Sequence, residues 1–254
     1  MSMRIIDCHI HNAGILSDPV RLEQTINRCE IACAVLAGNV VESHFPSVEQ
    51  VRRVNDATLA ITRQLPGQTL GLCYLNPTFT SEAIDEMLRC YDLGMIGVKL
   101  WVAVLCTDPC VEPVVRKAIE LKLPIVHHTW NKAVGQLPRE SRPTDLAILA
   151  KRFPDAKLIM CHTGGDWEFG IKAVRDCPNV KVDFAGTVDE RGAYETAIGE
   201  LGINRVVFGS DMPYGDFFGN LGRVLQLRLS ENDTNSILAS NFESLFPYKI
   251  SLEV

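Results

Sequence analysis

The stretch Ile5-Ile6-Asp7-Cys8-His9-Ile10-His11 is a short apolar run that ends in two histidines. Side chains of a strand alternate between its two faces, so we expect Asp7, His9 and His11 to share one face. Cys8 and Ile10 would then lie on the other face. Two imidazoles at the end of one strand favour a metal site, although an isolated His-x-His is more often a pair of surface histidines. The rest of the chain decides between these interpretations.

Seven further short apolar runs follow, separated by longer stretches with helical periodicity. The eight runs are residues 5–10, 31–36, 69–75, 96–101, 124–128, 158–162, 180–184 and 206–209. Between them, apolar residues repeat at helical spacing over residues 48–64, 81–91, 111–121, 145–153 and 191–201. Strands separated by helices pair in parallel through right-handed crossovers. Eight such units in 254 residues predict a (β/α)8 TIM barrel, because the alternative, an open doubly wound sheet, has no single rim to gather all eight strand ends.

The composition indicates a single globular domain over residues 1–254, with 46% hydrophobic and 22% charged residues. The formal net charge is −6 and no block of lysine and arginine occurs, which argues against nucleic acid or an anionic membrane surface as a partner. No apolar stretch reaches about 18 residues, the length that spans a membrane, and no signal peptide precedes the first run. We therefore expect a cytoplasmic protein.

The nine cysteines occur at irregular spacing. Cys8, Cys33, Cys73 and Cys161 lie inside apolar runs, where cysteine behaves as a small hydrophobic residue. The cysteines at positions 106 and 110 lack a second pair that would complete a zinc motif. We expect reduced thiols, in agreement with a cytoplasmic location.

Five of the six histidines lie where apolar runs end. In a barrel of this kind the active site forms at the C-terminal ends of the strands. The residues expected there are His9, His11, Lys99, His127, His128, His162 and Asp211. Imidazoles with a carboxylate suit zinc, and also manganese, iron or cobalt. The sequence therefore predicts a divalent metal site with an open position for water, whose pKa the metal would lower.

Several short motifs occur in the order typical of one enzyme family. They are Asp7-Cys8-His9-Ile10-His11, Gly97-Val98-Lys99-Leu100, Pro124-Ile125-Val126-His127-His128, Cys161-His162-Thr163-Gly164-Gly165 and Phe208-Gly209-Ser210-Asp211-Met212-Pro213. On this ordered set the chain resembles the amidohydrolase superfamily. It is most similar to the amidohydrolase-2 branch, which contains the aminocarboxymuconate-semialdehyde decarboxylase group. The resemblance covers nearly the whole chain.

The resemblance implies roles for the motif residues. His9 and His11 would bind the metal from the first strand, and a histidine of the fifth strand and Asp211 would complete its shell. His162 would contact the attacking water or the substrate. Asp211 would also be placed to accept a proton from that water.

The fifth strand carries two adjacent histidines, and alternation allows only one of them to face inward. We favour His128, because His128-Thr129-Trp130 resembles the His-x-Trp that follows this strand in the decarboxylase branch. His127 would then pack between strand and helix.

Lys99 has two interpretations. As a cation it would hold a substrate carboxylate or pair with a neighbouring acid at the edge of the core. Alternatively its amine would be carbamylated and would bridge two metals, as in several binuclear members of the superfamily that the chain resembles. The amidohydrolase-2 resemblance favours a single metal ion, Zn2+, and the binuclear site stays the alternative.

Further residues near the strand ends are candidates for supporting roles. We expect Asp7 behind the ligands, hydrogen-bonded to a ligand histidine or its neighbours. Trp101 and Trp130 would either wall a substrate pocket or simply pack there. Asn76 and Tyr214 are candidate substrate contacts. The loop over residues 131–143 either covers the site or is an ordinary surface loop.

The function predicted first is a metal-dependent hydrolase that uses activated water on an amide, lactone or ester of a small molecule. The alternative is a metal-dependent, non-oxidative decarboxylase of a small carboxylic acid, because the same ligands serve both reactions. A metal-binding barrel without catalysis is a third hypothesis, which the presence of both His162 and Asp211 disfavours. The family that the chain resembles also makes a homodimer a candidate assembly.

Overall fold

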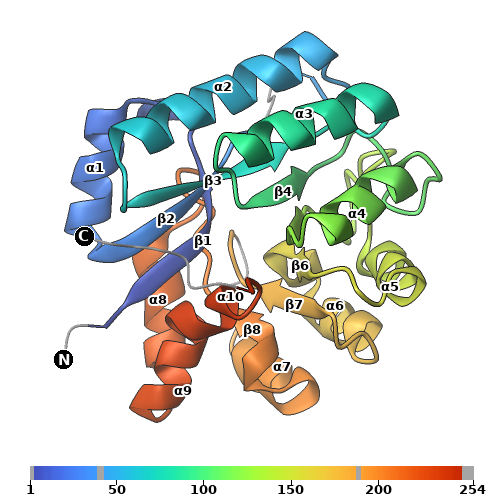
Figure 1. The fold of residues 1–254 in the computed structure, drawn as a ribbon. Helices are drawn as coiled ribbons and strands as arrows, with labels where there is room; N and C mark the ends of the chain where they lie inside the picture. The colour runs from blue at the N-terminus through green and yellow to red at the C-terminus, as the bar shows by residue number, and fades with distance from the viewer. Residues whose placement is uncertain (1–2, 39–42, 187–189, 248–254) are drawn as a thin grey trace.

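The computed structural model describes residues 3–38, 43–186 and 190–247, and Figure 1 shows its fold. Eight parallel strands follow one another around a single sheet in chain order. They are β1 (Ile5–His11), β2 (Ile31–Ala37), β3 (Thr69–Tyr74), β4 (Gly97–Leu100), β5 (Ile125–His127), β6 (Leu158–Met160), β7 (Val180–Asp183) and β8 (Val206–Val207). The predicted barrel is confirmed. Residues 1–2 and 248–254 lie outside the described part, so the domain boundaries stay a prediction.

Helices connect the strands and surround them (Figure 1). They are α1 (Pro19–Arg28), α2 (Val48–Gln64), α3 (Thr80–Asp92), α4 (Val111–Glu120), α5 (Pro143–Arg152), α6 (Trp167–Val174), α7 (Ala193–Leu201), α8 (Phe217–Leu225), α9 (Glu231–Asn235) and α10 (Asn241–Glu243), with short turns η1 (Gly14–Ser17), η2 (Cys161–Gly164), η3 (Ile203–Arg205) and η4 (Ser236–Ser240). The N-terminus of α2 shows how local sequence determines where a helix begins. The Ser47 hydroxyl accepts from the Gln50 N–H while the Ser47 N–H donates to the Gln50 side chain, a reciprocal cap.

The chain closes the barrel between β1 and the segment that follows β8. Cys8 N donates to Phe208 O at 3.0 Å, and His11 N donates to Met212 O at 2.7 Å. Asp211 N donates to His9 O at 2.8 Å between these two bonds. The backbone therefore brings Asp211 next to the histidines of β1.

The core has an inner and an outer layer. Ile6 and Cys8 pack inside the barrel, whereas Ile10 packs in the outer layer against the helices. The strict alternation expected for β1 is therefore wrong at Cys8, because the register of β1 against β2 shifts between Asp7 and Ile10. This irregularity leaves Cys8 and His9 both on the inner side, where His9 reaches the side chain of Lys99.

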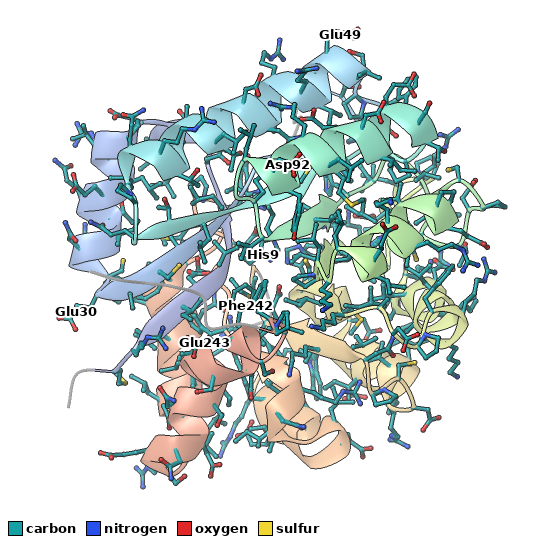
Figure 2. The ribbon with its side chains drawn as sticks, viewed as in Figure 1. His9, Glu30, Glu49, Asp92, Phe242 and Glu243 are labelled. Atoms are coloured by element: carbon teal, nitrogen blue, oxygen red, sulfur yellow. The ribbon has the colours of Figure 1, made fainter. Side chains whose placement is uncertain are left out.

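The C-terminal segment closes the end of the barrel opposite to that of the histidines. Phe242 of α10 and the following Leu245 and Phe246 pack with the inner layer. Figure 2 shows Phe242 near the centre of the molecule, below His9.

All nine cysteines are free thiols. Within the described residues, no helix is both long and apolar enough to cross a membrane.

Candidate metal centre

The C-terminal ends of the strands bring seven titratable side chains together. They are His9 and His11 on β1, Lys99 on β4, His128 after β5, His162 in η2, Asp183 at the end of β7 and Asp211 after β8. The ligand atoms of His9, His162 and Asp211 all lie within 4.8 Å of one another, a spacing that suits a metal ion. His11 and His128 extend this group on either side, next to Asp211 and His162 respectively.

Two of these residues hold left-handed backbone conformations. His162 has φ 59° and Asp211 has φ 63°, which costs a residue with a side chain roughly 1–2 kcal/mol. Contacts within the site compensate this strain. His162 N donates to Asp183 Oδ1 at 2.7 Å, and Asp211 O accepts from Tyr214 N at 2.8 Å. The turns are thus held in the shape that aims both side chains at the same region.

Burial makes three of the imidazoles neutral. It lowers the pKa of His9 well below its usual value, and it lowers the pKa of His128 and of His162 to about 4. A neutral imidazole has a hydrogen on one ring nitrogen and a free lone pair on the other. The hydrogen-bond partner of one nitrogen determines which of the two carries the hydrogen. The lone pair is the part that binds a metal.

The partners of the two β1 histidines assign their lone pairs to Nε2. His9 Nδ1 lies 3.0 Å from Asp183 Oδ2, and His11 Nδ1 lies 2.9 Å from the backbone oxygen of Ala37. A carboxylate or carbonyl oxygen only accepts, so both Nδ1 atoms carry the hydrogen. Both Nε2 atoms are left facing Asp211 Oδ1, at 3.5 Å from His9 and 3.2 Å from His11.

The same reasoning assigns the lone pairs of His128 and His162. His162 Nδ1 donates to the backbone oxygen of Ala185 at 3.0 Å, and His128 Nε2 donates to Glu140 Oε1 at 2.9 Å. The two remaining nitrogens, His128 Nδ1 and His162 Nε2, face each other at 3.2 Å. Neither has a hydrogen to donate, so these two lone pairs repel each other unless a positive charge lies beside both.

The ligand atoms of His9, His162 and Asp211 lie close enough together to share one metal ion, and His11 and His128 each approach one of these three residues. Two nitrogens bound to a tetrahedral zinc at about 2.0–2.1 Å lie roughly 3.3 Å apart. The separations of 3.2–3.5 Å around Asp211 and His162 are of this size. The donor set therefore fits a divalent metal with imidazole and carboxylate ligands.

Asp211 supplies the negative charge in this group. Burial alone would raise its pKa, but the close contact with His11 and the nearby imidazoles of His9 and His162 hold the pKa of Asp211 below the usual range of a carboxyl group. Asp211 is therefore ionised, as a metal-binding carboxylate must be.

Lys99 reaches the same site from β4 and is fully buried. Its Nζ donates to His9 Nε2 at 2.9 Å and to Cys161 Sγ at 3.3 Å. The ammonium of Lys99 and a metal ion would therefore compete for one lone pair of His9.

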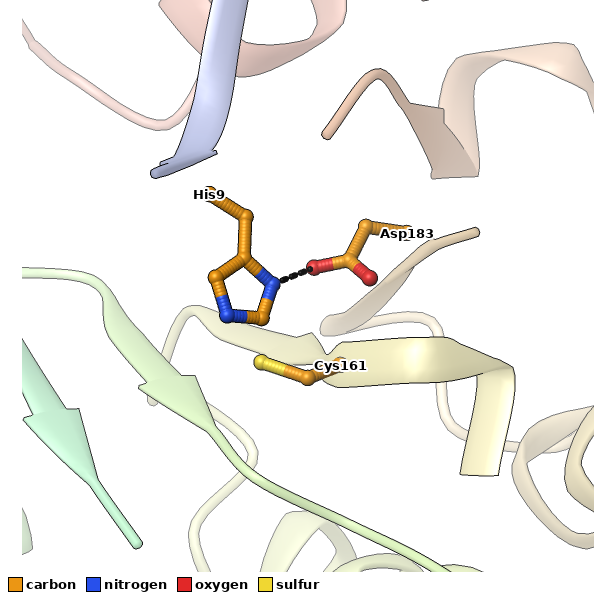
Figure 3. A group of neighbouring side chains, drawn as sticks. All are labelled: His9, Cys161 and Asp183. Atoms are coloured by element: carbon orange, nitrogen blue, oxygen red, sulfur yellow. Dashed lines mark hydrogen bonds and ion pairs between the residues drawn. The ribbon is translucent and has the colours of Figure 1, made fainter. Parts of the chain in front are cut away.

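A second group deeper in the barrel shares His9 and adds Cys161 and Asp183, with ligand atoms also within 4.8 Å of one another (Figure 3). The nitrogen of His9 that faces Asp183 carries the hydrogen of their bond, and burial raises the pKa of the Cys161 thiol. With Lys99 alongside, this group orients His9 and offers no free set of metal ligands.

Asp7 lies behind the histidines. Its Oδ1 accepts from the backbone N–H groups of His9 at 3.2 Å and Ser210 at 3.0 Å, so it ties β1 to the turn after β8. Burial raises the pKa of Asp7 to about 7, and its Oδ2 has no hydrogen-bond partner among the described residues.

Aromatic rings surround the imidazoles. The Trp130 ring lies 4.8 Å from that of His162, and the Tyr214 ring lies 5.5 Å from that of His11. Trp101 contacts the ring of His128 at 6.4 Å, centroid to centroid. The site thus has flat apolar walls that suit a small organic substrate.

Two residues near the strand ends lie outside the imidazole group: Asn76, a candidate substrate contact, and His127, which was expected to pack away from the site. Asn76 is not part of the imidazole group, because its amide donates to the backbone oxygen of Pro46 and accepts from Thr78, which ties two loops together. His127 is buried and lines a small cavity together with Leu100 and Val111, with Nδ1 2.6 Å from the backbone oxygen of His128.

Sequence reasoning missed Asp183 and Glu140. Asp183 lies near the end of the seventh apolar run, as His9 and Lys99 lie near the ends of theirs, and this was the available signal. Glu140 lies in the loop between β5 and α5, where nothing in the local sequence separates it from a surface acid. Only its contact with His128 reveals it.

Comparison with known protein families settles which family this is. The model of the amidohydrolase family, in its second branch, matches residues 6–247. The chain belongs to the amidohydrolase family. This family assignment agrees with the resemblance carried by the strand-end motifs. A search of curated proteins found no match.

Several solved structures share this fold. A 2,6-dihydroxybenzoate decarboxylase from Rhizobium has a TM-score of 0.76 at 17% identity, covering 96% of this chain and 98% of its own. A 5-carboxyvanillate decarboxylase from Sphingomonas paucimobilis has a TM-score of 0.76 at 15% identity, covering 96% and 99%. A dihydroxybenzoic acid decarboxylase from Polaromonas sp. JS666, with bound manganese and the inhibitor 2-nitroresorcinol, has a TM-score of 0.78 at 17% identity, covering 96% and 97%.

Proposed function

We propose that this amidohydrolase is a metal-dependent, non-oxidative decarboxylase of a small aromatic carboxylic acid. The observation that carries the proposal is the set of imidazole lone pairs that converge on Asp211 and His162 beside the ring of Trp130. The activities of the similar structures support decarboxylation over the hydrolysis expected first from the sequence.

We assign metal binding to His9, His11, His128 and Asp211, with His162 at the open side of the ion. A divalent metal held there would act as a Lewis acid toward the oxygen atoms of the substrate. The side chains of Trp101 and Trp130 would flank the ring of an aromatic acid, and Tyr214 would contact it beside His11.

The reaction requires one proton transfer, for which Asp211 and His162 are placed. A proton is added to the carbon that bears the carboxyl group, the bond to that group breaks with its electron pair left on the ring, and CO2 leaves. The pKa values of Asp211 and His162 lie below the usual ones, so either group gives up a proton readily once it has received one.

Hydrolysis is the second candidate function, and one observation favours it. Asp211 lies as a carboxylate beside the imidazoles of β1, and in hydrolysis it would accept a proton from the activated water. The same side chains would then serve an amide, lactone or ester.

The identity and number of metal ions form part of the proposal. Imidazole-rich sites generally bind Zn2+ more tightly than Mn2+, which favours the single zinc ion expected from the sequence. Manganese is the alternative, since the Polaromonas decarboxylase contains it. Elemental analysis of the purified protein distinguishes the two.

The test offers 2,6-dihydroxybenzoate and 5-carboxyvanillate to the metal-loaded protein in deuterated water. Decarboxylation releases CO2 and places one deuterium on the ring carbon that lost the carboxyl group. Hydrolysis of an ester or amide analogue with incorporation of oxygen-18 from water, without CO2 release from the acids, would replace the proposal by the second candidate. The variant His162→Gln should keep its metal and lose turnover.

A further inference from the structure

Glu140 is a buried carboxylate in the loop between β5 and α5, and all its partners are donors. Its side chain is 1% exposed. It accepts from His128 Nε2 at 2.9 Å, from Lys132 Nζ at 2.8 Å, from Gln136 Nε2 at 3.1 Å and from Leu137 N at 3.2 Å. Burying a charge is costly unless such partners surround it, so this position has a specific use.

The loop does not depend on this carboxylate alone for its shape. Trp130 N donates to the backbone oxygen of Ser141 at 2.9 Å, and Gln136 Nε2 donates to the backbone oxygen of Trp130 at 2.9 Å. Glu140 is, however, the acceptor that faces Nε2 of the His128 ring. Its contact with His128 is therefore the one that the other loop contacts do not replace.

The proton between Glu140 and His128 belongs to the imidazole. Four donors surround the Glu140 carboxylate, so it acts as an acceptor in each of these contacts. His128 Nε2 is therefore the donor to Glu140, and the lone pair of the neutral ring lies on Nδ1.

We propose that Glu140 is the positioning residue for His128, holding its hydrogen on Nε2 so that the lone pair of Nδ1 faces His162 and the metal. This inference rests on the proposed function, since it assumes that His128 is a ligand. Without Glu140, a neutral ring places its hydrogen on either nitrogen, and the Nδ1–H form cannot bind the ion.

The role also couples the loop to the metal. Lys132 donates to the same carboxylate oxygen as His128 and lies over the ring of Trp130, 5.3 Å from its centre. A loop conformation that withdraws Glu140 would therefore release His128 and at the same time move the contact between Lys132 and Trp130.

The experiment compares three variants of the full chain. Glu140→Leu removes the acceptor at similar size, and Glu140→Gln keeps an acceptor oxygen while losing the charge. Asp145→Asn is the matched control, because Asp145 caps α5 at Arg142 N and has no histidine partner among the described contacts.

The first measurement is metal affinity by competition with a chelator, using Zn2+ and Mn2+ separately. Removing an outer partner of a metal-binding histidine typically weakens binding about 10–100-fold, which is the loss expected for Glu140→Leu. Glu140→Gln should lose less, and Asp145→Asn should bind as the unaltered protein does. Equal affinity of Glu140→Leu and the unaltered protein would overturn the proposal.

The second measurement is independent of metal and of activity. In metal-free protein labelled with 15N-histidine, the nitrogen shifts of His128, identified by their loss in His128→Gln, report which nitrogen carries hydrogen. We expect hydrogen on Nε2 in the unaltered protein and a mixture in Glu140→Leu. Hydrogen on Nδ1 in the unaltered protein overturns the inference, even where Glu140→Leu does not fold. Failure of the unaltered protein to bind either metal would instead overturn the proposed function.

Discussion

Asp183 Oδ2 lies 3.0 Å from His9 Nδ1, although the two residues stand on strands that are separated by β8 and are 174 positions apart in the chain. The same carboxylate accepts from the backbone N–H of His162 at 2.7 Å. The buried Asp183 side chain thus orients both His9 on β1 and the turn η2, which carries His162.

Asp183→Asn is expected to weaken metal binding about 10–100-fold, the usual effect of altering a partner that orients a ligand histidine. The amide keeps the size of the carboxylate but has one acceptor oxygen in place of two, so either His9 Nδ1 or the His162 N–H would face an NH2 group. Chelator competition measures the loss, and circular dichroism checks the fold. The exposed Asp176 provides the control Asp176→Asn, which should bind normally. Unchanged affinity in Asp183→Asn would remove Asp183 from the site.

Lys99→Met distinguishes the one-metal from the two-metal site. Because Lys99 Nζ competes for the lone pair of His9 Nε2, the variant should keep one metal per chain and bind it at least as tightly as the unaltered protein. Metal analysis gives the ratio, and the mass of the intact chain reports any carbamate. A fall from two metals to one, with a carbamate present in the unaltered protein, would establish the binuclear alternative.

Gly165→Ala should displace Trp130, because a Cβ there would lie 2.2 Å from Trp130 Cδ1. Gly165 has φ +75°, so the substitution also costs roughly 1–2 kcal/mol in backbone strain. Gly135→Ala is the control, since Gly135 has φ +73° and nothing within 4 Å of its Cβ position. Urea unfolding should show a further loss of about 1–3 kcal/mol for Gly165→Ala over the control. Equal losses would mean that the ring of Trp130 moves freely.

The buried His127 should make the metal-free protein less stable in acid. Burial lowers its pKa to about 4, against 6.5 for an ordinary histidine. The unfolded chain therefore takes up a proton below pH 6.5 that the folded chain refuses until about pH 4. Stability from this group is complete above pH 6.5 and falls by about 3 kcal/mol as the pH drops to 4.

Urea unfolding of metal-free protein at pH 7.5 and pH 4.5 measures this dependence. His127→Gln should reduce this dependence, since glutamine does not titrate, while the other buried histidines still contribute to it. If the variant has the same pH dependence as the unaltered protein, the pKa of His127 is the same in the folded and the unfolded chain.

Much of the fold follows from local patterns. Each of the eight apolar runs overlaps a strand, and the periodic stretch predicted over residues 48–64 coincides with α2. These patterns depend on spacing along the chain, which the sequence displays directly. The exception is β1, where the register shift between Asp7 and Ile10 overrides alternation, because a neighbouring strand sets the register.

The sequence by itself determined the barrel, its family and the strand-end residues from which the site is built, because each depends on residue type and order along the chain. Only the tertiary structure decided which ring nitrogen of each histidine carries its lone pair. The deciding acceptors are Ala37, Glu140, Asp183 and Ala185. Glu140 lies in the same β5–α5 connection as His128, whereas the other three belong to segments far along the chain from the histidines that they orient. A hydrogen bond forms between atoms that are close in space, and no local pattern encodes a closeness that arises when distant strands meet around one barrel.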